Sequence, residues 1–315
     1  MITLKQTKVG SYTVLNLTDP QLSCGDWDDP ETQGIFDHTV KTLVSRVKPD
    51  LITVSGDFAY AGGTRSYREY TDYFTSLGIP WTCCFGNHDN QGGDEPIEQD
   101  LEIFRESPPF LWEDSPKELG HGNFVLKVGS CALILMDTHD RVPVTREDGN
   151  IEKLWAKLTE EQIIWYREQV RELKNAGSTE SVLITHIPIY AYREAAKAAY
   201  REGLDQKALP PDAKGEAVFN KGFEDASGVC WEGICSYPED EGMLDAILSE
   251  AHTKTVLCGH DHINNFIIPY RGIRFVYALK TGKGCYWDKR MNGGTVIEIA
   301  PNGRAEVRHE YVEIP

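Results

Sequence analysis

Side chains of the types that bind metal ions stand directly after apolar runs in this sequence. Asp19 follows VLNLT, Asp57 follows LITVSG, and the group Asn87, His88 and Asp89 follows TCCFG. Two more groups follow later apolar runs: His186 after VLIT, and His260, Asp261 and His262 after TVLCG. Carboxylate, imidazole and amide donors together suit Mn, Fe or Zn better than Mg or Ca alone. Because these donors are too many for one ion, we expect a pair of ions that share a bridging carboxylate.

The elements that must position these donors are predicted from the spacing of apolar residues. In the N-terminal half we expect strands at 12–18, 51–55 and 81–85, separated by helices at 35–47 and 67–77. Two consecutive strand–helix–strand units indicate a parallel sheet covered by helices. Since the C-terminal ends of parallel strands share one edge, the donors that follow the strands are expected in one crevice.

The rest of the chain continues this alternation less regularly. The clearest helix is expected at 159–177, where Thr159 and Gln162 form a capping box. A further helix is expected at 243–249, and strands are expected at 124–128, 131–136, 181–185, 255–258, 266–269, 274–278, 295–299 and 305–311. The segment 188–241 is rich in Gly, Pro and charged residues, so we interpret it as a cap-like insertion with one short helix.

The charge balance limits the expected partners. The 315 residues include 32 Lys and Arg against 49 Asp and Glu, a formal net charge of −17. Such a chain repels long nucleic acid and anionic membranes, so neither is an expected partner. The chain does not start with the apolar run of a signal peptide, and no later segment approaches the roughly 18 apolar residues of a membrane span. We therefore expect a single cytoplasmic domain, residues 1–315, with reduced cysteines.

The ordered series of donors from Asp19 to His262 resembles the signature of the calcineurin-like metallophosphoesterase family. The resemblance implies an α/β fold in which two mixed β-sheets, flanked by helices, form a four-layer αββα sandwich. A dimetal site would then lie at the C-terminal ends of the strands. The ligand set that the resemblance implies is Asp19, Asp57 and His262 for one ion, with Asn87, His186, His260 and the shared Asp57 for the other. By the same resemblance, His88 would contact the phosphoryl group or protonate the leaving oxygen, and Asp89 would orient His88.

The first motif departs from the family pattern. The family usually has Asp-x-His, whereas this chain has Asp19-Pro20-Gln21, and Gln21 offers at best a weak carbonyl oxygen. The run Gly-Asp-Phe-Ala-Tyr that ends at Tyr60 resembles the Gly-Asp-x-x-Tyr motif of purple acid phosphatases, in which the tyrosine ligates ferric iron. One interpretation is that Tyr60 replaces the missing imidazole, and the centre then holds Fe(III) together with Fe, Zn or Mn. The other is that Tyr60 packs in the loop or touches substrate while Gln21 coordinates or hydrogen-bonds, and the centre then holds Mn, Zn or Fe.

Later motifs resemble a purple-acid-phosphatase-like subgroup of the family. They are HIPIY at 186–190, GHDHINNF at 259–266 and TGKGCY at 281–286. Three residues are candidate substrate contacts, each with a structural alternative. His139 could reach substrate or serve as a polar loop residue, and Tyr190 could stack on a substrate ring or close the core of the insertion. Arg193 belongs to a basic stripe that either meets the anionic group of the substrate or forms a solvated helix face.

The resemblance implies hydrolysis of small phosphorylated substrates, with monoesters favoured, by attack of a metal-bound hydroxide on phosphorus. One alternative is a phosphodiesterase that acts on nucleotide-like or lipid-derived diesters. The other is a phosphoesterase-like scaffold with little or no turnover, for which the absence of histidine at position 21 is the only support. The oligomeric state is not predicted.

Overall fold

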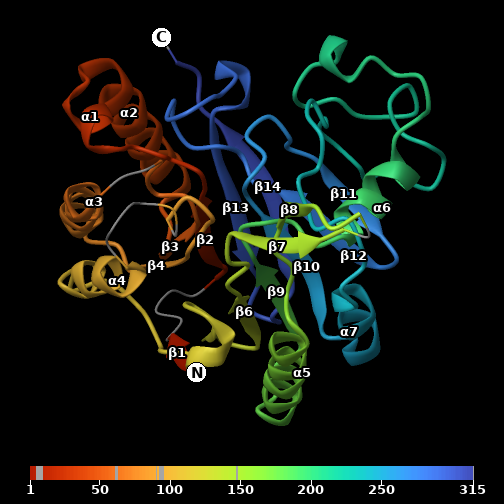
Figure 1. Ribbon diagram of the computed structural model, residues 1–315, viewed down its shortest axis with the longest axis horizontal. Helices are drawn as coiled ribbons and strands as arrows, with labels where there is room; N and C mark the ends of the chain where they lie inside the picture. Colours follow the sequence, from red (N-terminus) through yellow and green to blue (C-terminus); the bar gives the residue numbers. More distant parts are fainter. Residues whose placement is uncertain (5–9, 61–62, 90, 92–95, 147, 315) are drawn as a thin grey trace.

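Two β-sheets lie face to face in the computed structural model, which describes residues 1–4, 10–60, 63–89, 91, 96–146 and 148–314 (Figure 1). The larger sheet has seven strands in the order β1 (Ile2–Leu4), β5 (Phe124–Val128), β6 (Cys131–Leu135), β9 (Glu180–Ile184), β10 (Thr253–Cys258), β12 (Ile273–Tyr277) and β11 (Ile267–Tyr270). The smaller sheet has five strands in the order β14 (Ala305–Tyr311), β13 (Gly293–Ile299), β2 (Tyr12–Leu17), β3 (Leu51–Ser55) and β4 (Trp81–Cys84).

Strand direction brings the C-terminal ends of the central strands together. In the smaller sheet β2, β3 and β4 are parallel, as the two strand–helix–strand units predict. In the larger sheet β6, β9, β10 and β12 are parallel. Antiparallel pairs occur in both sheets, between β2 and β13 in one and between β11 and β12 in the other. Both sheets are therefore mixed.

Three groups of buried apolar residues define the layers of the fold. The first lies between the sheets and includes Leu51 and Val182, while the next residues along the same strands, Ile52 and Leu183, face the two outer groups. This alternation follows from the two-residue period of a strand. The helices on the smaller sheet are α2 (Pro30–Val47), α3 (Thr64–Leu77) and α4 (Ile97–Arg105), and those on the larger sheet are α5 (Glu160–Asn175), α6 (Ala191–Ala199) and α7 (Met243–Glu250). The four-layer αββα class is confirmed.

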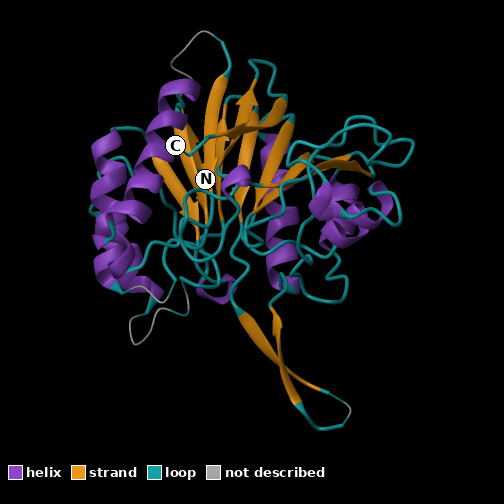
Figure 2. Ribbon diagram, turned by 90° about the horizontal axis from the view of Figure 1, so that it is seen from above, coloured by secondary structure: helices purple, strands orange, loops and turns teal. Residues whose placement is uncertain are grey.

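Several elements differ from the predictions. Helix α2 begins at Pro30 rather than at residue 35, because the Asp29 carboxylate caps it by accepting a hydrogen bond from the amide of Thr32. Strand β1, helix α1 (Cys24–Asp28), helix α4 and the hairpin of β7 (Arg141–Thr145) and β8 (Ile151–Trp155) are not predicted. Figure 2 shows this hairpin projecting from the body of the molecule. Three short 3-10 helices, Lys117–Leu119, Gln206–Ala208 and Lys289–Met291, complete the elements of the described residues.

The insertion at 188–241 packs on the outside of the larger sheet. After α6 it has few regular elements, but its apolar side chains share one core with the sheet and α7. The insertion members of that core include Val218, Phe219, Val229 and Trp231. None of the helices in the described part of the chain has the length and hydropathy that crossing a bilayer requires.

Candidate metal centre

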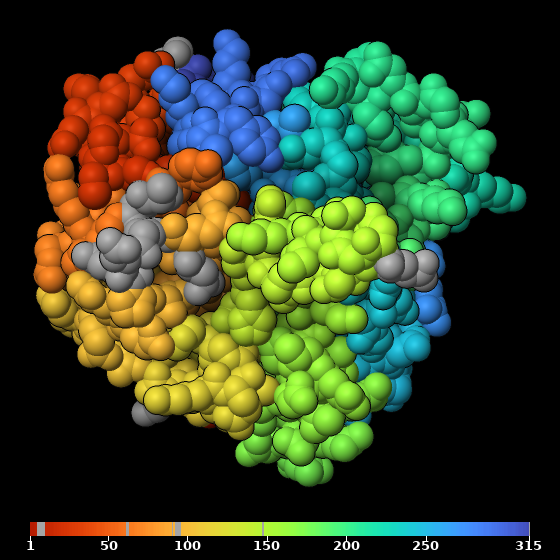
Figure 3. Space-filling view, in the orientation of Figure 1, coloured from red at the N-terminus to blue at the C-terminus, as the bar shows by residue number. Residues whose placement is uncertain are grey.

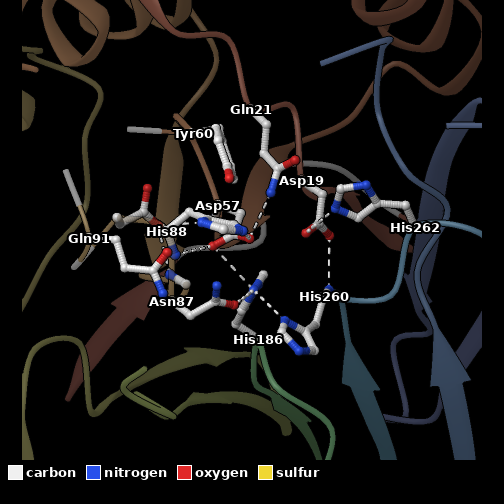
Figure 4. A network of polar contacts seen from close by, with 12 residues as sticks. Asp19, Gln21, Asp57, Tyr60, Asn87, His88, Gln91, His186, His260 and His262 are labelled. Atoms are coloured by element: carbon white, nitrogen blue, oxygen red, sulfur yellow. Dashed lines mark hydrogen bonds and ion pairs between the residues drawn. The ribbon is translucent and has the colours of Figure 1, made fainter. Parts of the chain in front are cut away.

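The predicted donors converge where C-terminal strand ends of both sheets meet (Figure 4). Asp19 and Asp57 follow β2 and β3, and His88 follows β4, all in the smaller sheet. His186 and His260 follow β9 and β10 in the larger sheet. The clustering of metal-binding residues at the sheet ends, predicted from the sequence, is confirmed.

The loops that carry these donors are bent and tightly packed. Asp19, Asp57 and His260 have φ values of 51°, 56° and 81°. These lie in the left-handed region of backbone conformation, which residues other than glycine rarely adopt. A Cβ on Gly86 would lie 2.1 Å from Asp57 Oδ1, and one on Gly259 would lie 2.6 Å from Asp19 Oδ2. The glycines therefore allow the backbone to approach the two carboxylates closely, which restricts the direction of their oxygens.

One group of donor atoms surrounds Nε2 of His186. This nitrogen lies 3.1 Å from Asn87 Oδ1, 3.2 Å from Asp57 Oδ1 and 3.3 Å from His260 Nδ1. Ligand atoms about 2.1 Å from one ion stand about 3.0 Å apart in an octahedron and about 3.4 Å apart in a tetrahedron. The donor atoms are thus spaced like the edges of a coordination polyhedron. The ligand atoms of Asp57, His186 and His260 all lie within 4.8 Å of one another.

A second group contains Asp19, Gln21 and His262. Nε2 of His262 lies 3.4 Å from Asp19 Oδ1, and Nε2 of Gln21 donates a hydrogen bond of 2.9 Å to Asp57 Oδ2. Asp57 therefore directs one oxygen toward each group, Oδ1 toward His186 and Oδ2 toward Gln21. This arrangement would allow the Asp57 carboxylate to bridge two ions.

Backbone carbonyls set the tautomers of two histidines. Nδ1 of His186 donates to the carbonyl of Ser55 at 2.8 Å, and Nδ1 of His262 donates to the carbonyl of Tyr286 at 2.7 Å. With the proton on Nδ1, the lone pair of each Nε2 is directed into the cluster. Metal-binding histidines are held in this way in known sites.

The donor set fits a pair of cations. Two buried oxygens of the cluster, Asp19 Oδ1 and Gln21 Oε1, have no hydrogen-bond partner among the described residues. A buried polar atom without a partner costs about 1–3 kcal/mol, and a coordinated cation would satisfy both oxygens. Carboxylate and amide oxygens with imidazole nitrogens match the donor preferences of Mn, Zn and Fe.

The electrostatics of the cluster also favour cations. Burial disfavours the charged form of His186, but the Asp57 and Asp19 carboxylates outweigh burial and raise its pKa to about 10. Burial would raise the pKa of Asp19, yet the charges of His186 and His262 hold it well below its usual range. Burial and the nearby charge of His186 lower the pKa of His260 to about 3. The carboxylates are thus ionised and His260 is neutral, as metal ligands must be. The carboxylates hold a second proton on His186, and a cation that binds Nε2 would displace this proton.

His88 and Asp89, the predicted catalytic pair, have different surroundings. The side chain of His88 is 21% exposed, its Nε2 lies 4.0 Å from Asp57 Oδ2, and its ring centre lies 4.5 Å from that of Tyr60. The buried Asp89 carboxylate accepts hydrogen bonds from the amides of Gly86, Asp57 and Phe58 and from the hydroxyl of Tyr67. Our expectation that Asp89 orients His88 therefore differs from the hydrogen bonds observed, which tie the Asp57 loop to the Gly86 loop.

Gln21 and Tyr60, the alternatives for the remaining donor, lie in different environments. Gln21 is fully buried beside Asp57, and its Oε1 is one of the oxygens without a partner. Tyr60 is 50% exposed, its ring packs against His88, and its hydroxyl end points toward Asp57 (Figure 4). The buried position and the unpartnered oxygen both favour Gln21 as the donor.

The three predicted substrate contacts interact with residues outside the donor cluster. Nδ1 of His139 lies 3.3 Å from the carboxylate of Asp137, which raises the pKa of His139 against the opposing effect of burial. Tyr190 immediately precedes α6, and its amide donates a hydrogen bond of 3.2 Å to the carboxylate of Glu241. The guanidinium of Arg193 donates to the hydroxyl and the carbonyl of Ser236, so this arginine braces the insertion.

Three residues that the sequence analysis does not single out complete the surroundings of the cluster. Lys280 is 2% exposed, and its ammonium donates to the carbonyl of Asp19; burial lowers its pKa to about 8. The Tyr286 ring stacks on His262 with centres 4.0 Å apart, and its hydroxyl donates to Glu232 at 2.9 Å. A lone lysine just after a buried strand is a sequence signal of the same kind as the donors themselves. Tyr286 ends the motif TGKGCY, whereas Glu232 carries no such signal.

Comparisons with known proteins agree with this geometry. A family model described as calcineurin-like phosphoesterase matches residues 12–264. The chain is 24% identical over 330 residues to probable inactive purple acid phosphatase 14 of Arabidopsis thaliana, which covers 90% of this chain and 74% of that protein. It is 30% identical over 190 residues to a probable cyclic nucleotide phosphodiesterase of Psychrobacter arcticus, covering 56% of this chain and 60% of that protein. The solved structure of a dimetal phosphatase from Danio rerio has a TM-score of 0.54 at 9% identity, covering 95% and 99% of the two chains, a likeness of fold alone.

Proposed function

Because the chain belongs to the calcineurin-like phosphoesterase family, we propose that it hydrolyses small phosphate esters and prefers monoesters to diesters. The observation that carries the proposal is the buried donor cluster, in which the ligand atoms of Asp57, His186 and His260 lie within 4.8 Å of one another. The preference for monoesters rests on the similarity to purple-acid-phosphatase-like relatives.

The cluster supports a centre of two cations, with Mn, Zn or Fe as the candidate metals. The proposed ligands are Asp19, Gln21 and His262 for one cation, Asn87, His186 and His260 for the other, and Asp57 for both. Gln21 is preferred to Tyr60 because it is buried and has an unpartnered oxygen, whereas Tyr60 is half exposed.

Bound at these positions, two cations would supply Lewis acidity toward the phosphoryl oxygens and an activated water. The protein residues would supply position and a proton. His88, at the partly exposed side of the cluster, is suited to donate a proton to the leaving oxygen. Asp89 would act indirectly, since its hydrogen bonds to the Asp57 and Gly86 amides hold the loop that carries the shared carboxylate.

Two other functions have specific support. The similarity to a protein named probable cyclic nucleotide phosphodiesterase favours a diester substrate. The similarity to a protein named probable inactive purple acid phosphatase, together with Gln21 in place of histidine, favours a scaffold that binds metal with little turnover. Both functions retain the metal centre. The first predicts hydrolysis of diesters and the second predicts little hydrolysis of any ester, so turnover measured on defined esters distinguishes them.

The test is a panel of mono- and diesters assayed with the full chain loaded with Mn, Fe or Zn. We expect turnover of monoesters and two ions per chain by elemental analysis. Asp57→Asn should lower turnover at least about 100-fold and deplete both ions, since one carboxylate serves both groups. The control is Asp72→Asn, which removes an exposed carboxylate on α3 and should change neither quantity. Full turnover by the Asp57 variant would refute the assignment, and two bound ions without turnover would support the scaffold.

A further inference from the structure

The β7–β8 hairpin projects from the body of the molecule (Figure 2), and Trp155 at its root contacts the proposed ligand His260. Among the described residues its strands pair with each other alone, Arg141 opposite Trp155 at the root and Thr145 opposite Ile151 toward the tip. In Figure 3 the hairpin lies at the front of the molecule, because it projects toward the viewer in that orientation. A two-stranded hairpin is at best marginally stable by itself in water, so its position depends on the contacts at its root.

Two contacts attach the root to loops of the centre. The Trp155 ring meets the ring of His260 edge to face, with centres 4.3 Å apart and an interplanar angle of 84°. Just before the other strand, the carboxylate of Asp140 accepts a hydrogen bond of 2.5 Å from Nε2 of Gln91, three residues beyond His88. The root is therefore fixed to a loop of each sheet, one with a proposed ligand and one with the proposed acid.

Arg141 is positioned by this arrangement. Its guanidinium carbon lies 4.0 Å from the centre of the Trp155 ring, a cation–π contact that orients the planar group. Together with the 4.3 Å between the rings of Trp155 and His260, this places the guanidinium no more than about 8 Å from the His260 ring. The Arg141 guanidinium thus lies at the edge of the donor cluster, close to one of its proposed metal ligands.

No carboxylate of the described residues lies within ion-pairing distance of Arg141, although the chain has 49 acidic residues against 32 basic ones. Arg146, on the same hairpin, is ion-paired with Glu152. Arg141 is exposed, so its N–H groups can bind an incoming anion. In a chain of net charge −17, an oriented arginine that has no acidic partner among the described residues is well suited to an anionic substrate.

We propose that Arg141, held on Trp155, binds a second anionic group of the substrate, a carboxylate or phosphate carried by the leaving group. The inference rests on the proposed function and makes it more specific: the preferred substrates are phosphate esters with two separated negative charges. The metal centre takes the phosphoryl group, and the root of the hairpin takes the second anion. A charge-assisted hydrogen bond at a partly solvated position increases affinity by about tenfold.

The test compares two unreactive ligands, benzylphosphonate and 4-(phosphonomethyl)benzoate, which differ by one carboxylate. Their affinities for the metal-loaded full chain are measured by isothermal titration calorimetry, so the result does not depend on turnover. We expect the wild type to bind the carboxylate ligand about tenfold more tightly. In Arg141→Gln this preference should fall below about twofold, and Arg141→Lys should retain part of it because charge remains without the planar fork.

The matched control is Lys153→Gln, which removes one exposed positive charge from the same hairpin farther from the root. It should keep the tenfold preference, and loss of the preference in this variant would overturn a specific role for Arg141. Equal binding of both ligands by the wild type, or an unchanged preference in Arg141→Gln, would overturn the subsite and leave the proposed function intact. Failure of the wild type to bind either phosphonate would overturn both.

Discussion

Gly259 offers the most direct test of how the metal centre is built. Replacing it with alanine adds one methyl group in the loop before His260. Its backbone lies outside the left-handed region, so the perturbation is steric. The new Cβ would lie 2.1 Å from Thr18 Oγ1 and 2.6 Å from Asp19 Oδ2.

The expected effect follows from these distances. Ordinary van der Waals contact begins near 3.4 Å, so the Thr18 hydroxyl must move by about 1.3 Å and the Asp19 oxygen by about 0.8 Å. Asp19 Oδ2 would then lose its hydrogen bonds from Thr18 and from the amide of His260, which measure 2.7 and 3.0 Å. Metal sites tolerate about 0.2 Å of ligand displacement, and misplacement by about 1 Å can cost 100-fold in rate. We therefore expect kcat/KM of Gly259→Ala to fall about 100-fold, equivalent to about 2.7 kcal/mol.

The assay combines elemental analysis after dialysis at limiting metal, steady-state hydrolysis of 4-nitrophenyl phosphate, and a thermal melt. The variant should lose the ion next to Asp19 before the ion next to His186. The control is Gly34→Ala, since a Cβ at this position in α2 meets nothing within 4 Å and should slightly stabilise the helix. If Gly259→Ala binds two ions and keeps kcat/KM within threefold of wild type, the close packing around Asp19 does not govern metal binding.

Three further predictions concern the surroundings of the centre and the acid stability of the fold. Tyr60→Phe should leave metal content unchanged, and the iron-loaded wild type should lack the visible tyrosinate–Fe(III) band; a band that disappears in the variant would make Tyr60 a ligand. The Glu232 carboxylate accepts hydrogen bonds from the Tyr286 hydroxyl and from the amide of Ile263, and Glu232→Gln removes one of these two acceptor oxygens. The variant should weaken metal affinity about tenfold in chelator competition, because Tyr286 stacks on His262. Unchanged affinity would contradict a link from Glu232 through Tyr286 to the metal centre. Burial lowers the pKa of His309 to about 4 from the ordinary 6.5, so only the unfolded chain gains this proton as pH falls from 6.5 to 4, and the free energy of unfolding should drop by at most about 3 kcal/mol. His309→Gln should flatten that pH dependence in denaturant titrations, and an unaltered slope would exclude His309 as its source.

Elements with strong local signals were predictable from sequence. Strand β3 has the predicted bounds, Leu51–Ser55, and the capping box of Thr159 and Gln162 stands at the start of α5 as expected. The β7–β8 hairpin was not predictable, because it is largely exposed and lacks the alternation that a core imposes. Strand β1, Ile2–Leu4, has three residues, which is too short for a periodic pattern.

The donor cluster was predictable because each donor follows a strand, whereas the contacts that hold the donors were not. The Asp89 carboxylate binds backbone amides, which every residue possesses, so no side-chain pattern marks its role. Glu232 and Tyr286 are 54 residues apart and meet only because the insertion folds back toward the loop after β12. The proposed role of Arg141 depends on its contact with Trp155, which the sequence does not predict.

The geometry of the cluster argues against a scaffold that never binds metal. Such a protein would keep Asp19 Oδ1 and Gln21 Oε1 buried without partners, at about 1–3 kcal/mol each. That cost is a large part of the 5–15 kcal/mol by which a folded protein is typically stable. It would also hold Asp19 and Asp57 ionised in the interior, with φ values above 50°. Cations offset the unsatisfied oxygens and the buried negative charge together. We therefore expect Gln21, in place of histidine, to weaken the binding of one cation rather than to abolish metal binding.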